Sequence, residues 1–75
     1  MKEDLLFCMN MEALSVKELV ESSPDDSDNI YYYLGRMHVY EEVYKKLYGN
    51  IPEPTLKNMT HASMMVYDWQ KARRT

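Results

Sequence analysis

Apolar side chains recur every three or four residues through the middle of the chain, and this pattern predicts a long amphipathic helix. The recurring positions are Ile30, Tyr33, Met37, Tyr40, Tyr44 and Leu47. Side chains at such spacings lie on one side of an α-helix. We therefore expect this stripe to be a core face or a face that meets a second copy of the chain.

The start of this central helix is marked by a serine, a proline and two aspartates in the sequence SSPDD. Ser23 is a suitable N-cap, and Pro24 suits the first helical turn, where its missing amide proton costs nothing. These signals predict a helix over residues 24–48. The alternative is that residues 24–29 form a polar loop and that Asp28 or Asn29 supplies the cap.

Gly49 and Pro52 indicate the end of the central helix and the beginning of another one. A second set of residues at helical spacing follows them: Leu56, Met59, Ser63, Val66 and Gln70. This set predicts an amphipathic helix over residues 54–72. The adjacent Met64 and Met65 lie off the centre of its apolar face, so we expect at least one of them to contact a partner or the N-terminal helix.

The N-terminal third has a less regular pattern. Ser15 and Glu18 have the spacing of a capping box, which predicts a short helix from Val16 to about Ser22. Residues 3–13 then form either a separate helix or a short strand, and we favour the helix. Together these elements predict one all-α domain over residues 1–75, a bundle of three to four helices around the Tyr-rich central helix.

Length and charge narrow the possibilities further. A chain of 75 residues buries a small core, and the central helix has a wide apolar surface, so we expect a homodimer. The single cysteine, Cys8, fits a reducing compartment and a cytoplasmic protein. The formal net charge of −3 argues against nucleic acid as a partner, and the short apolar run after Met1 predicts no membrane segment.

Few side chains in this sequence suit catalysis. His38, His61 and Cys8 are too few for a zinc site of the usual four-ligand kind. Glu41 and Glu42 are adjacent and so point about 100° apart on a helix, which suits ion pairs with the lysines four residues later rather than acid–base catalysis. We therefore expect no enzyme activity, no metal and no cofactor.

The three consecutive tyrosines suggest a binding surface, because about 100° per residue spreads them over roughly 200° of the central helix. Only Tyr33 falls on the apolar stripe, and Tyr31 is the ring we most expect to meet something outside the chain. Gly35 is either a point of close approach for a partner or a tolerated defect inside the helix. The candidate partner-binding residues are Tyr31, Tyr32, Gly35, Arg36, His38, Val39 and Val43.

The sequence YYYLGRMHVYEEVYKKLYG resembles a pattern found in small helical accessory proteins encoded by phages. The residues that carry the resemblance are Gly35, Val39, Tyr40, Glu42 and Val43. The resemblance implies a protein that acts in the host cytoplasm, where it binds and inhibits or redirects a host factor or a defence system.

Two functions are thus predicted. The first is a non-enzymatic protein-binding module that presents tyrosine and methionine side chains, since tyrosine offers a large contact area with little rotamer entropy to lose. The alternative is a small-ligand or nucleotide binder, in which tyrosine rings stack on a base and Arg36 or the terminal arginines contact phosphate.

Overall fold

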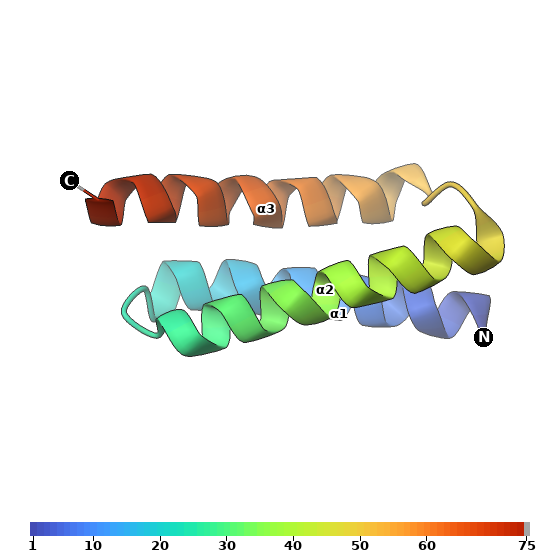
Figure 1. Ribbon diagram of the computed structural model, residues 1–75, viewed down its shortest axis with the longest axis horizontal. Coiled ribbons are helices and arrows are strands. Elements are labelled where there is room, and N and C mark those ends of the chain that lie inside the picture. Colours follow the sequence, from blue (N-terminus) through green and yellow to red (C-terminus); the bar gives the residue numbers. More distant parts are fainter. Residues whose placement is uncertain (75) are drawn as a thin grey trace.

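The computed structural model describes residues 1–74, which form a bundle of three helices (Figure 1). Helix α1 spans Lys2–Ser22, α2 spans Ser27–Tyr48 and α3 spans Glu53–Arg74. The bundle is 40 Å long and about 17 Å across. The predicted all-α bundle is confirmed, and it has three helices in the described part of the chain.

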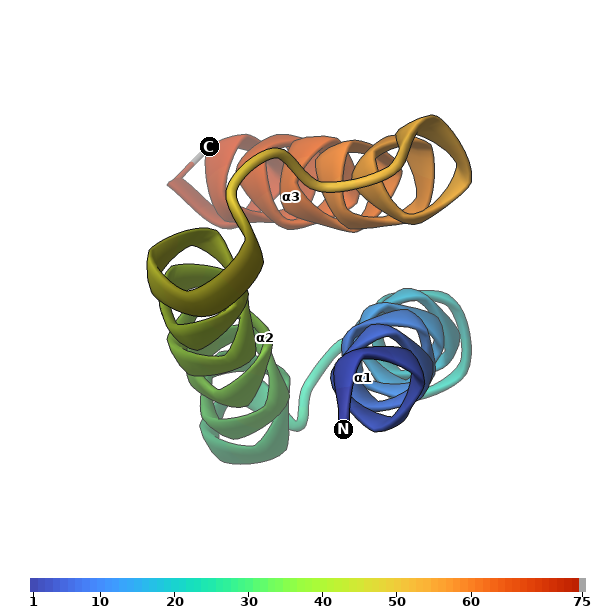
Figure 2. The ribbon, with the colours of Figure 1, turned by 90° about the vertical axis from the view of Figure 1, so that its right-hand side faces the viewer.

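Helix α1 is the centre of the arrangement. It packs along both other helices, whereas α2 and α3 make few contacts with each other. Viewed end-on, α1 lies to one side of α2 and beneath α3 (Figure 2). This arrangement leaves the side of α2 that faces α3 only partly covered.

The core is apolar and lies where the three helices converge. Its buried members are Met9, Ala13, Val16, Ile30, Met37, Tyr44, Ile51, Met59, Ala62, Val66 and Trp69. Partly buried leucines, valines and tyrosines pack around them. At about 25 cal/mol for each Å² of apolar surface removed from water, this burial is the main stabilising contribution to the fold.

The prediction of two segments in the N-terminal third is wrong, because α1 runs without a break through Ser15. Leu5, Met9, Val16 and Leu19 continue one stripe at helical spacing, and the residue that interrupts it is Glu12. Glu12 is buried and accepts a 2.8 Å hydrogen bond from Nε of Arg36 on α2. Because an acidic side chain occupies a core position, the apolar pattern alone does not predict the full length of this helix.

The predicted start of the central helix at Pro24 is also wrong. The backbone amide of Ser23 donates to the carbonyl of Leu19 and so closes α1 instead of beginning the next helix. Asp26 is the N-cap of α2, and its carboxylate accepts a 2.7 Å hydrogen bond from the side-chain amide of Asn29. Pro24 therefore belongs to the turn. The polar-loop alternative is right for residues 24–26 only, because residues 27–29 are helical and the N-cap is Asp26 rather than Asp28 or Asn29.

The two connections hold the helix ends in place. Gly49 ends α2 with a φ of 87°, a backbone conformation that residues other than glycine rarely adopt. In the other turn, the carbonyl of Pro24 accepts a 2.7 Å hydrogen bond from the indole N–H of Trp69 on α3. Asn10 on α1 links to Thr55 and Asn58 at the other end of α3.

Within residues 1–74 no helix is long and apolar enough to cross a membrane.

Candidate partner-binding groove

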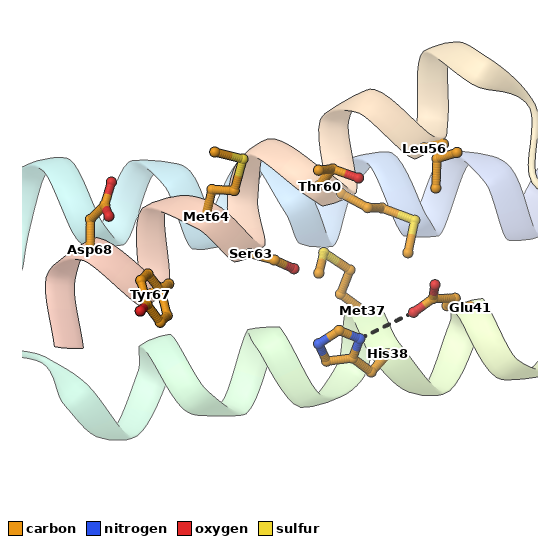
Figure 3. Close-up of a pocket in the computed structure, with 10 residues that line it drawn as sticks. Met37, His38, Glu41, Leu56, Thr60, Ser63, Met64, Tyr67 and Asp68 are labelled. Atoms are coloured by element: carbon orange, nitrogen blue, oxygen red, sulfur yellow. Dashed lines mark hydrogen bonds and ion pairs between the residues drawn. The ribbon is translucent and has the colours of Figure 1, made fainter. Parts of the chain in front are cut away.

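A groove of about 440 Å³ lies between α2 and α3, on the side where these helices are not packed together (Figure 3). The buried side chains of Met37 and Met59 lie at its base. Its walls come from both helices, and we call these ten residues the α2–α3 groove. They are Met37, His38, Glu41, Leu56, Met59, Thr60, Ser63, Met64, Tyr67 and Asp68.

The α3 wall of the groove follows from the register of that helix. Leu56, Thr60, Ser63 and Tyr67 are three or four residues apart, so they lie on one side of α3 over about three turns. Tyr67 is 60% exposed and Met64 is 62% exposed, so a wide apolar surface remains in contact with solvent here. Lys71 lies over the ring of Tyr67, with its Nζ 5.6 Å from the ring centroid.

The α2 wall is polar at its edge. Nδ1 of His38 and Oε1 of Glu41 are 3.1 Å apart, and Lys45 lies 3.2 Å from the other carboxylate oxygen of Glu41. Partial burial opposes the charge on Glu41, but the hydrogen bonds from His38 and Lys45 outweigh it and hold the pKa of this carboxyl below its ordinary value. Glu41 is therefore ionised at neutral pH. The predicted pairing of Glu41 with Lys45 is present, whereas Glu42 and Lys46 form no ion pair within residues 1–74.

A second hollow continues the groove towards the N-terminus of α3. It shares Leu56, Thr60 and Met64 with the groove and adds Glu53, Lys57 and His61. The accessible surface therefore extends along most of the outer side of α3.

The structure divides the seven candidate partner-binding residues among three sides of α2. Tyr31 and His38 lie towards α3. Tyr31 packs edge-on against Trp69 with the ring centroids 5.5 Å apart, and its hydroxyl accepts a 2.9 Å hydrogen bond from Gln70. Tyr31 is thus held by α3 within the chain, although 47% of it is exposed.

Arg36 lies on the side of α2 towards α1, and Tyr32 lies one turn before it on the outer side, where it is 55% exposed. The guanidinium of Arg36 donates to Glu12 on α1 and to the hydroxyl of Tyr32, and it lies over the rings of Tyr32 and Tyr40. The hydrogen bond to Glu12 is the main reason that the pKa of Arg36 is raised. Because these internal partners engage Arg36, the structure does not favour a role for it in binding phosphate.

Val39 and Val43 are exposed on the outer side of α2, and Gly35 lies on the same outer side. A Cβ built on Gly35 would have no neighbour within 4 Å, so nothing within the described chain requires glycine there. No part of the described chain therefore approaches Gly35 closely. Close approach by another molecule stays a prediction.

The residues expected on the core or oligomer face differ in burial. Ile30, Met37 and Tyr44 are buried, and Tyr33 and Tyr40 are partly buried. Leu47 is 57% exposed and lies outside the core of the single chain.

The groove is lined mainly by apolar and hydroxyl-bearing side chains. Within residues 1–74 no three side chains among His, Cys, Asp and Glu come together as a group that could hold a metal ion. Cys8 is a half-buried free thiol on α1. The chemistry that the groove offers is apolar contact from sulfur and aromatic side chains, with hydroxyl and carboxylate groups along the edge.

Sequence reasoning found only part of this groove. The sequence predicts His38 as a partner contact and Met64 or Met65 as a contact of a partner or the first helix. It also places Met37, Leu56, Met59 and Ser63 on its apolar stripes. Tyr67 and Asp68 were missed, because which side of α3 stays uncovered depends on where α2 packs. No family model, curated protein or solved structure matches the chain.

Proposed function

We propose that this protein is a non-enzymatic protein-binding module, and that it binds its partner in the α2–α3 groove. The observation that carries the proposal is the groove itself: buried methionines at its base and exposed Met64 and Tyr67 on its wall. When another protein covers large apolar side chains that a small domain leaves exposed in a concave surface, their removal from water stabilises the complex.

The kind of side chain supports a protein as the ligand. Methionine is flexible and polarisable, so a methionine-lined groove adapts its shape to a partner's side chains. Tyrosine is enriched at the energetic centre of protein interfaces. The bound protein would act by covering a surface of its partner. This agrees with the resemblance to phage accessory proteins, which implies a protein that inhibits or redirects a host factor in the cytoplasm.

The test is affinity capture from a native lysate with mass spectrometry, comparing the wild type with the double variant Met64→Glu and Tyr67→Glu. Both side chains are mostly exposed, so we expect the variant to fold, and circular dichroism checks this. The matched control is Phe7→Glu on α1, which is 65% exposed and lies outside both the groove and the outer side of α2.

We expect the groove variant to lose a partner that the wild type and the Phe7→Glu variant both retain. Capture of the same proteins by the folded groove variant would contradict the proposal, and so would the absence of any captured partner in the wild type.

A further inference from the structure

We infer that the occupant of the α2–α3 groove is a basic amphipathic helix of the partner protein. This inference rests on the proposed function and specifies the partner's chemistry. It depends on three properties of the groove: its length, its apolar base and the sign of the charges in its lining.

The length and shape of the groove fit a helix. Residues 56–68 of α3 contribute to the lining, and at about 1.5 Å per residue they span roughly 18 Å. Two helices form the walls and α1 lies behind them (Figure 3). A partner helix laid between α2 and α3 would be the fourth helix of the bundle. Its apolar side chains, three or four residues apart, would reach Met37 and Met59.

The charges favour a basic partner. The lining includes two carboxylates, Glu41 and Asp68, and neither lysine nor arginine. The lysines beside it are Lys45, which pairs with Glu41, and Lys71, which lies over the ring of Tyr67. Glu41 already interacts with Lys45, whereas Asp68 is exposed and has no ion-pair partner within residues 1–74. A lysine or arginine on the partner helix would give Asp68 a partner, and an acidic helix would be repelled.

The adjoining hollow is more balanced in charge, because Glu53 and Lys57 both line it. Electrostatic selection therefore takes place at the Asp68 end of the groove. We expect the basic residues of the partner helix to flank its apolar stripe near that end.

Two synthetic peptides test the inference. Each has sixteen residues with leucines at helical spacing, and they differ only in having lysine or glutamate on the flanks of the leucine stripe. Methyl NMR of the methionines locates binding, because Met37, Met59 and Met64 line the groove and Met1, Met9, Met11 and Met65 do not.

We expect the lysine peptide to shift the methyl signals of the three groove methionines and to bind at least about tenfold more tightly than the glutamate peptide, a difference of 1.4 kcal/mol. We expect Asp68→Lys to remove most of this preference. The control is Glu21→Lys on α1, which changes the net charge equally and lies outside the groove.

Several results would overturn the inference. Equal binding of the two peptides would exclude electrostatic selection, and an equal effect of Glu21→Lys would indicate attraction to the whole acidic molecule. Shifts at the other methionines would place the helix elsewhere. Self-association that Met64→Glu abolishes would make a second copy of the chain the occupant.

The peptide experiment is independent of the capture experiment. If the groove variant loses its captured partner but neither peptide binds, the proposed function stands and the basic helix is wrong.

Discussion

Glu41 lies at the edge of the groove and links two neighbours on its own helix. Its carboxylate interacts with His38 three residues before it and with Lys45 four residues after it. Such pairs on a helix surface contribute about 0.3–0.5 kcal/mol each. The pairs also hold a negative charge in place beside the apolar base of the groove.

This carboxylate makes the stability of the protein depend on pH. Its pKa is lower in the folded state than the ordinary value of 4.5, so its ionised form favours folding. The contribution is fully present above the unfolded pKa and is lost as the pH falls through the folded pKa. We expect Glu41→Gln to lower the free energy of unfolding at pH 7 by less than about 1 kcal/mol, and to flatten the loss of stability below pH 4.5.

Urea denaturation between pH 3 and pH 7, followed by the fluorescence of the single tryptophan, measures this effect. The control is Glu42→Gln, because the neighbouring carboxylate has no ion pair within the described residues. If both variants changed the acid limb equally, the pairing of Glu41 would not be its cause.

Single residues also show why the apolar stripe of α2 could be predicted from the sequence and the unbroken length of α1 could not. Arg36 is a charge beside the apolar stripe of α2, and Glu12 is the charge within the stripe of α1 with which it pairs. A buried carboxylate is tolerated because the guanidinium neutralises it and donates a hydrogen bond. The sequence contains both charges but does not show that they meet, because they are 24 residues apart in the chain and lie on different helices.

At the level of the helices, the central segment could be predicted because its pattern and its C-terminal signals agree. Gly49 ends the helix with a positive φ, as its position predicts. The turn between α1 and α2 was harder to predict, because Ser23 ends α1 but is also a residue type that commonly caps the start of a helix. The groove could not be predicted as a unit, since it depends on how far apart α2 and α3 pack.

The two glycines of the chain are expected to respond in opposite ways to alanine. Gly35 lies inside α2 with open space around it, so Gly35→Ala should raise the free energy of unfolding by about 0.5–1 kcal/mol through helix propensity. Gly49→Ala places a side chain at a φ of 87° and should lower it by about 1–3 kcal/mol.

Chemical denaturation of the two variants checks the signs. A stabilised Gly35→Ala variant that no longer captures the partner would identify a close approach at Gly35, whereas unchanged capture would make it a tolerated defect. Destabilisation by Gly35→Ala would contradict the open surroundings described for this residue.

For the whole molecule, the question is whether a second copy covers the outer side of α2. Val39, Val43 and Leu47 are exposed there, on the side away from the α2–α3 groove. We expect a homodimer that buries these side chains. Light scattering coupled to size-exclusion chromatography should give a mass near twice 9.0 kDa, and Val43→Glu with Leu47→Glu should return it to that of one chain.

Met64→Glu is the control, since a change in the groove should leave the dimer intact. A mass of one chain for the wild type at high concentration would exclude the dimer. Loss of the dimer in the Met64→Glu variant would place the self-association in the groove.

The central position of α1 also determines what holds the groove together. Helix α3 is held through contacts with residues far earlier in the chain, among them Asn10 and Pro24. Because α2 and α3 contact each other little, the groove depends on the docking of α3 against the rest of the chain. A partner that spans both walls would therefore hold α3 in place, and its binding would slow the exchange of backbone amide protons in α3.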